Sequence, residues 1–245
     1  MYRLWLMFRS IVFWIWQIIV TLVLGGPVII VGLFSFRYGY ALAVLWNKCN
    51  VWGLRFICGV TWEVDGLENI PDKPCVVMSK HQSTWDAYFL PTLFYPGVYV
   101  AKRSLLFIPI FGWALYVLKF IMIDRKSGRS AMHQMCEQAT DRLSRGRWII
   151  VFPEGTRRPV GAEPQYRIGG AMIAQNVPAD VVPVAVNAGE FWPRMGFIKW
   201  PGTITVSIGP VIPSEGKKAS QILAETQDWI EGRMAEITVQ DRFPY

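Results

Sequence analysis

An uncharged apolar run near the N-terminus is the feature that most constrains the fold of this chain. Between Arg9 and Arg37 lie 27 residues without a charged side chain, SIVFWIWQIIVTLVLGGPVIIVGLFSF. About 20 apolar residues are enough for a helix to cross the hydrocarbon core of a bilayer. The run is too long for the apolar region of a signal peptide, and no A-x-A-like cleavage site closes it. It therefore predicts a membrane segment, in preference to a buried helix of a soluble protein.

Gly25, Gly26 and Pro27 interrupt this run, because proline removes a backbone donor and clashes with the preceding turn. Two arrangements remain open: one kinked span, or two helices that meet at residues 25–27 and enter a single leaflet as a hairpin. A straight helix over residues 10–36 would be about 40 Å long, against a hydrocarbon core of roughly 30 Å. Residues 11–24 alone reach only about 21 Å. Basic residues flank both ends, so the positive-inside rule favours the hairpin with both flanks on the cytoplasmic face.

Composition supports contact with lipid and with an anionic ligand. Five of the 12 Trp lie in the first 52 residues, and residues 1–62 hold five Lys/Arg and no acidic residue. Residues 37–60 mix apolar stretches with single basic residues, which is typical of a helix in the headgroup layer. Residues 102–167 hold 12 Lys/Arg against five Asp/Glu. That excess suits an anionic ligand. Nucleic acid is an alternative, but the chain has no nucleic-acid-binding motif.

The few cysteines and histidines argue against a metal site. The chain has four Cys, none in a C-x-x-C pattern, and two His. Structural zinc sites need four such ligands at characteristic spacings. We therefore expect no metal, no other cofactor, and reduced thiols in a protein that faces the cytoplasm.

After residue 58 the pattern changes to alternating strands and helices. Strands are predicted at residues 59–64, 75–79, 97–101, 120–124, 147–152, 181–186 and 203–209. Helices are predicted at 84–95, at 128–146 and from Ser214 onward. Such alternation indicates an α/β fold, a mixed sheet flanked by helices. We expect residues 1–58 to form the membrane-anchoring helices and residues 59–245 the catalytic domain.

The stretch KHQSTWDAYFLP (80–91) contains His81, with Asp86 five residues later. One interpretation is structural: Ser83 and Asp86 have the spacing of a helix capping box. The other is catalytic, since a carboxylate on one imidazole nitrogen leaves the other nitrogen as a base. The chain has no G-x-S-x-G nucleophile motif. In the catalytic interpretation, the activated hydroxyl therefore belongs to a substrate.

Three further motifs follow in order: IDR (123–125), FPEGTRR (152–158) and VPV (182–184). Each alone is also compatible with an ordinary turn, a solvated loop or a plain strand. Arg125 and Arg157 each come just after a predicted strand. An arginine at such a position can contact a phosphate through two hydrogen bonds.

Together, H-x-x-x-x-D, I-D-R, F-P-E-G-T-R and V-P-V resemble the motifs of the 1-acyl-sn-glycerol-3-phosphate acyltransferases of bacteria. The resemblance covers about residues 59–212 and includes VDGLENIP at 64–71. F-P-E-G-T-R is the most specific of these motifs. One departure is VLKFIM (117–122), where the family often has a glycine shortly before I-D-R. The implied fold is that of the glycerolipid acyltransferases.

The resemblance also implies a role for each motif residue. His81 would take the proton of the sn-2 hydroxyl of lysophosphatidic acid, oriented by Asp86, while the hydroxyl attacks an acyl thioester. The acceptor phosphate would be bound by Arg125 and Arg157. The remaining implied substrate-binding residues are Lys102, Glu154, Gly155, Thr156 and Pro183, the last at the pocket floor. His133 is expected to be structural.

The implied partners are lysophosphatidic acid, membrane phospholipid, and acyl-CoA or acyl carrier protein as the donor. Two alternatives stay open on the sequence. The acceptor could be another lysophospholipid or glycerol 3-phosphate, or the chain could be a lipid-binding protein without catalytic activity.

Overall fold

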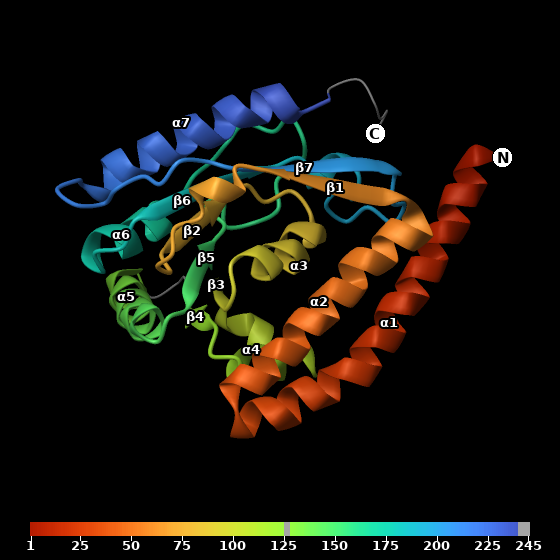
Figure 1. The fold of residues 1–245 in the computed structure, drawn as a ribbon, viewed down its shortest axis with the longest axis horizontal. Coiled ribbons are helices and arrows are strands. Elements are labelled where there is room, and N and C mark those ends of the chain that lie inside the picture. The colour runs from red at the N-terminus through yellow and green to blue at the C-terminus, as the bar shows by residue number, and fades with distance from the viewer. Residues whose placement is uncertain (125–127, 240–245) are drawn as a thin grey trace.

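The fold is built on a seven-stranded sheet with the strand order β1-β7-β6-β2-β5-β3-β4 (Figure 1). The computed structural model describes residues 1–124 and 128–239. Neighbouring strands are parallel except β6 and β7, which are antiparallel. The predicted mixed α/β sheet is confirmed. The strands are β1 (Val60–Asp65), β2 (Val76–Ser79), β3 (Gly97–Lys102), β4 (Ile121–Ile123), β5 (Trp148–Val151), β6 (Val181–Val186) and β7 (Gly202–Ile208).

Helices cover both faces of the sheet. Successive side chains of a strand point to opposite faces, and in β2 all of them are buried, so both faces need a covering layer. In β2, Val77 belongs to a core that includes Trp85 of α3. Its neighbour Met78 belongs to a second core with Ala171 of α6 and Ile222 of α7. The α-helices that follow residue 58 are α3 (Thr84–Leu93), α4 (Phe111–Val117), α5 (Gly128–Ser144), α6 (Gly169–Asn176) and α7 (Ala219–Ile237).

Three details of this region differ from the sequence predictions. The short helices α4 and α6 were not predicted. The last helix begins at Ala219 with Lys218 as its N-cap, so the predicted start at Ser214 is wrong. The backbone N–H of Ser214 instead donates to the Asp180 carboxylate, at 3.1 Å, in the loop before the helix.

The first 58 residues form two long antiparallel helices, α1 (Tyr2–Phe34) and α2 (Phe36–Cys58), which lie side by side (Figure 1). Within the described residues, α1 is the one helix long and apolar enough to cross a membrane. Its outward side chains include Ile11, Ile18 and Leu22, and residues 10–34 carry no charge. The outward face of α2 mixes apolar with basic residues, including Leu45, Lys48, Trp52, Arg55 and Phe56. The predicted helix over this second segment is confirmed.

The favoured arrangement, two helices that meet at Gly25–Gly26–Pro27, is wrong, because α1 continues through these residues with Pro27 inside it and the chain turns at Ser35. A single helix through residues 25–27 was the alternative. Close packing explains the glycine at 25: a Cβ atom there would lie 2.6 Å from Cγ2 of Ile110. At the tip of the hairpin, a Cβ atom on Gly39 would lie 2.5 Å from the Cα of Gly32. These glycines let neighbouring segments approach closely, as small residues do between membrane helices.

Near its N-terminal end, α1 also contacts the α/β region that follows residue 58. Phe13 is fully buried in the core that contains Trp85. The Ser10 hydroxyl accepts a hydrogen bond from the backbone N–H of Lys199, at 2.9 Å. The ammonium of Lys199 is buried, lies 4.0 Å from the ring centroid of Trp14, and donates to the Phe197 carbonyl at 2.8 Å. The two helices therefore share one core with the sheet.

We predict that alanine substitutions at two glycines of the helical hairpin, Gly39 and Gly26, have opposite effects on thermal stability. Gly39→Ala would press a methyl group onto the backbone of Gly32, an overpacking that typically costs about 1–3 kcal/mol. Gly26→Ala is the matched control: a Cβ atom there meets nothing within 4 Å, and alanine favours a helix over glycine by up to about 1 kcal/mol. Thermal unfolding in detergent should show a lower midpoint only for Gly39→Ala. An unchanged or raised midpoint for Gly39→Ala would contradict this packing.

Candidate active site

His81 and Asp86 are brought together by the turn between β2 and α3. β2 ends at Ser79, and α3 begins at Thr84 with Ser83 as its N-cap. Asp86 lies in the first turn of α3, and its Oδ2 is 3.0 Å from Nδ1 of His81. The predicted contact between the two side chains is confirmed.

The Asp86 carboxylate makes the contacts that both the structural and the catalytic interpretation require. Its Oδ2 accepts hydrogen bonds from the backbone N–H groups of Gln82, at 2.9 Å, and Ser83, at 2.8 Å. The side chain and backbone of Ser83 complete a capping box with it. Asp86 is fully buried. The carboxylate therefore shapes the turn and contacts the imidazole with the same oxygen atom.

The imidazole of His81 is held from two directions. Its ring stacks on Phe152, with ring centroids 3.7 Å apart and planes 10° apart. A carboxylate that already accepts two N–H groups is an acceptor for Nδ1–H as well. Nε2 is then left with a free lone pair. Because the side chain is 15% exposed and lines a cavity, this nitrogen is available to a substrate.

The FPEGTRR loop follows β5, which neighbours β2 in the sheet, and it fixes the backbone around His81. Oε2 of Glu154 accepts the N–H of His81 at 3.0 Å, and the N–H of Arg158 donates to the His81 carbonyl at 2.8 Å. Burial raises the pKa of the Glu154 carboxyl, and the ammonium of Lys80 acts in the opposite direction. Glu154 therefore holds the backbone of His81 in place through this hydrogen bond.

A buried charge cluster connects this loop to the C-terminal helix. The ammonium of Lys80 lies 3.0 Å from Oε1 of Glu154 and 2.8 Å from Oε1 of Glu231 in α7. The hydroxyl of Tyr166 donates to the same Glu231 oxygen at 2.7 Å, and burial raises the pKa of this tyrosine. Lys80 is 3% exposed, so it is largely enclosed between the two carboxylates.

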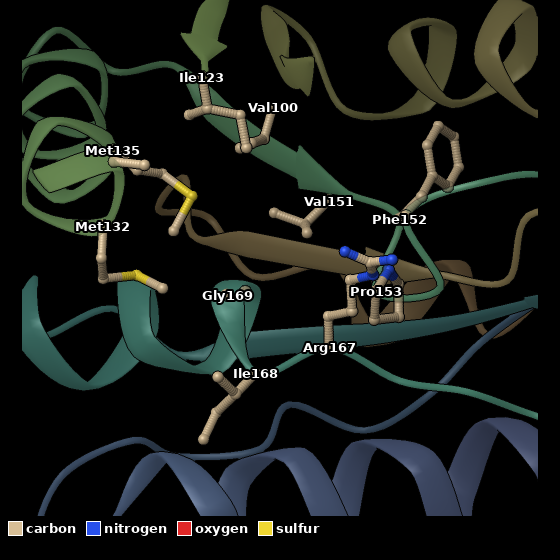
Figure 2. Close-up of a pocket in the computed structure, with 13 residues that line it drawn as sticks. Val100, Ile123, Met132, Met135, Val151, Phe152, Pro153, Arg167, Ile168 and Gly169 are labelled. Atoms are coloured by element: carbon tan, nitrogen blue, oxygen red, sulfur yellow. The ribbon is translucent and has the colours of Figure 1, made fainter. Parts of the chain in front are cut away.

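One cavity opens beside His81, and a second cavity adjoins it. The first, of about 240 Å³, is lined by His81 and by the predicted site residues Lys102, Gly155 and Thr156, together with apolar side chains. The second, of about 350 Å³, is lined mainly by apolar residues. In Figure 2, Met132 and Met135 project into this second cavity from α5. The two cavities share Val100, Phe152 and Gly155, so the space beside His81 adjoins a second, largely apolar space.

The remaining predicted residues are distributed unevenly around these cavities. Nη1 of Arg157 donates to the Thr84 hydroxyl at 2.6 Å, which places its guanidinium beside the turn that holds His81. Pro183 is buried in β6 opposite Met78 of β2. It lines neither cavity. The next residue, Val184, begins the antiparallel ladder with β7. Arg125 lies outside the described residues.

The departure from the family pattern before I-D-R has a counterpart in the backbone. Lys119 has φ of 59°, in the left-handed region where glycine is favoured. Lys119 thus adopts a backbone conformation that a glycine would adopt more easily.

Sequence reasoning missed Lys80, Thr84, Phe152 and Glu231 as parts of the site. Lys80 directly precedes the histidine motif, and Phe152 is the first residue of the FPEGTRR motif. Their positions in the sequence therefore indicated that both lie near the site. Glu231 carried none, because its contact with Lys80 joins residues 151 positions apart.

The comparisons with known proteins agree with this geometry. Residues 61–187 match the acyltransferase family. The chain is 44% identical to a 1-acyl-sn-glycerol-3-phosphate acyltransferase of Pseudomonas aeruginosa, over 86% of this chain and 84% of the relative. It is 28% identical to a chloroplast 1-acyl-sn-glycerol-3-phosphate acyltransferase of Arabidopsis thaliana, over 89% of this chain and 60% of the relative.

The fold is similar to the crystal structure of the 1-acyl-sn-glycerophosphate (LPA) acyltransferase PlsC from Thermotoga maritima. The TM-score is 0.77, the sequence identity is 22%, and the match covers 97% of this chain and 99% of the other. At this level of identity, the likeness establishes the shared fold.

Proposed function

The chain belongs to the acyltransferase family, among its 1-acyl-sn-glycerol-3-phosphate acyltransferases, and from this we propose that His81 is its general base. The reaction transfers an acyl group from a thioester to the sn-2 hydroxyl of 1-acyl-glycerol 3-phosphate and gives phosphatidic acid for phospholipid synthesis. The observation that carries the assignment is the 3.0 Å contact between His81 Nδ1 and the buried Asp86 carboxylate.

The steps follow from this contact. Nε2 of His81 takes the proton of the acceptor hydroxyl as its oxygen attacks the thioester carbonyl carbon, and Asp86 stabilises the imidazolium that forms. Collapse of the tetrahedral intermediate breaks the carbon–sulfur bond. The imidazolium then returns the proton to the leaving thiolate, which regenerates neutral His81. The thiol is that of CoA or acyl carrier protein.

The acceptor phosphate is assigned to the basic residues around the first cavity. Lys102 lines that cavity, is exposed, and pairs with Ile123 in the β3–β4 ladder. Arg125 lies two positions after Ile123 in the sequence. Arg157, held beside α3 by Thr84, supplies a second planar donor group suited to phosphate.

We predict that His81→Ala abolishes nearly all acyl transfer, since a positioned base contributes about 10²–10⁴-fold. Asp86→Asn should lose less, because an amide can still accept the capping hydrogen bonds. The matched control is His133→Ala, which removes the other histidine at a side chain that is 76% exposed. Thiol release from acyl-CoA in the presence of lysophosphatidic acid measures the rate. A His81→Ala rate above about a tenth of wild type would be incompatible with this mechanism.

Arg157→Ala should raise the KM for lysophosphatidic acid by about 10- to 100-fold, as expected from about 1.5–3 kcal/mol for a hydrogen bond to a charged group. The KM for the acyl donor should change much less. Arg145→Ala is the control, because that arginine is exposed and pairs with Asp141 on α5. Initial rates with each substrate varied in turn separate the two effects. A loss of donor affinity with unchanged acceptor affinity would refute the phosphate role.

We also place α1 and α2 in one leaflet, on the cytoplasmic face of the membrane. The apolar outward face of α1 suits hydrocarbon, and the mixed face of α2 suits the headgroup layer. Because the two helices are antiparallel, the chain returns to the end of the hairpin where it began (Figure 1). Membrane phospholipid is therefore a partner of these helices.

A labelling experiment tests this topology. In a variant without the four native cysteines, Tyr2→Cys should resist a membrane-impermeant maleimide added to intact cells, and react after the cells are opened. The same reagent on an outward-facing cysteine of a known membrane protein serves as the positive control. Labelling of Tyr2→Cys in intact cells would show that the chain crosses the membrane as a single span.

A further inference from the structure

The segment from η2 (Arg103–Phe107) through α4 exposes an unusual number of large apolar side chains. Phe107 is 83% exposed and Tyr116 is 64% exposed. Ile108, Phe111 and Trp113 are also exposed. Contiguous apolar patches of this kind on a soluble surface mark contact sites for another molecule or for a membrane. Nothing in the sequence patterns had singled out this segment.

The exposed patch is continuous with the apolar face of α1. Ile110 packs into the space left by Gly25, and Val117 packs against Gly32. An apolar cavity of about 280 Å³ lies between the two elements and is lined by Ile29, Leu33, Leu106, Gly112, Trp113, Tyr116 and Val117. Whatever medium surrounds the C-terminal half of α1 therefore also reaches α4.

The same segment has an inner side that faces the catalytic cavity. Leu105, Phe111 and Leu115 line the cavity that contains His81. One short stretch of chain thus separates the reactive nitrogen from the exposed apolar patch. A lipid that leaves the bilayer at this place therefore lies next to the cavity that His81 lines.

Basic residues stand at both ends of the patch. Lys102 and Arg103 precede it and Lys119 follows it, and all three are exposed. Apolar side chains bordered by lysine and arginine are the pattern of segments that lie in the headgroup layer of an anionic membrane. The charge and the continuity with α1 both favour lipid over a protein partner.

We propose that residues 103–117 are a third membrane contact, in addition to α1 and α2, and the entry by which the acceptor lipid passes from the leaflet to His81. The inference rests on the proposed membrane placement of α1. Phe107 and Trp113 insert among the acyl chains, and Arg103 and Lys119 contact anionic headgroups. The acyl chain of the acceptor stays in lipid while its phosphate and hydroxyl reach the cavity.

The depth of single labels in the bilayer tests this directly. In the full-length chain without native cysteines, an environment-sensitive fluorophore is attached at Phe107→Cys, at Ile19→Cys on α1, or at Ala224→Cys on α7. Ala224 is exposed, and α7 lies across the molecule from α1 and α4 (Figure 1). The proteins are reconstituted in phosphatidylcholine–phosphatidylglycerol vesicles with or without brominated acyl chains.

We expect brominated lipid to quench the labels at Phe107 and Ile19, and not the label at Ala224. Quenching at Ile19 without quenching at Phe107 overturns the inference and leaves the membrane placement of α1 intact. Absence of quenching at both positions overturns the placement of α1 as well. A signal at Phe107 that depends on protein concentration and not on brominated lipid would assign the patch to a second copy of the chain.

A kinetic comparison gives an independent readout. The double variant Phe107→Ser/Trp113→Ser should lower the rate with vesicle-bound long-chain acceptor relative to a water-soluble short-chain acceptor by about tenfold, since these apolar side chains no longer partition into lipid. Met195→Ser, at a residue that is 85% exposed in another loop, is the matched control. An equal change of both rates would contradict an entry role. Circular dichroism verifies that the double variant is folded.

Discussion

One carboxylate oxygen organises the centre of this molecule. Oδ2 of Asp86 accepts N–H groups from Gln82, Ser83 and the ring of His81. The two backbone contacts start α3 at the end of β2, and the third fixes the imidazole relative to that start. Because the carboxylate is fully buried, removing any of these donors would leave charge poorly compensated in an apolar setting. The same atom thus fixes a local fold and orients the proposed base.

The surroundings of this turn are rigid for the same electrostatic reason. The Glu154 carboxylate accepts the N–H of His81 and is itself paired with the buried ammonium of Lys80. Lys80 also reaches Glu231 of α7, so the last helix of the chain supports the turn. On the other side, His81 lines a cavity that adjoins a second, largely apolar cavity. The proposed base therefore lies beside a space that suits an apolar acyl chain.

The sequence predicted the strands and most of the longer helices, because alternation and turn residues are local signals. It also predicted the His81–Asp86 contact, since the capping-box spacing and the catalytic spacing coincide in five residues. Of its two arrangements for Gly25–Gly26–Pro27, the favoured one, a turn between two helices, was wrong. The packing partner of Gly25 is Ile110, 85 positions away, and no local pattern reveals that partner. Glu231 escaped notice for the same reason, and Arg125 stays a prediction outside the described residues.

The central claim is that Asp86 holds His81 with the proton on Nδ1 and the lone pair on Nε2. Nitrogen-15 NMR of histidine-labelled protein in detergent measures this tautomer directly, and the chain has only two histidines to assign. His133, which is highly exposed, provides the internal reference for a solvated ring. The account predicts that neutral His81 carries its proton on Nδ1. A neutral His81 with its proton on Nε2 would contradict it.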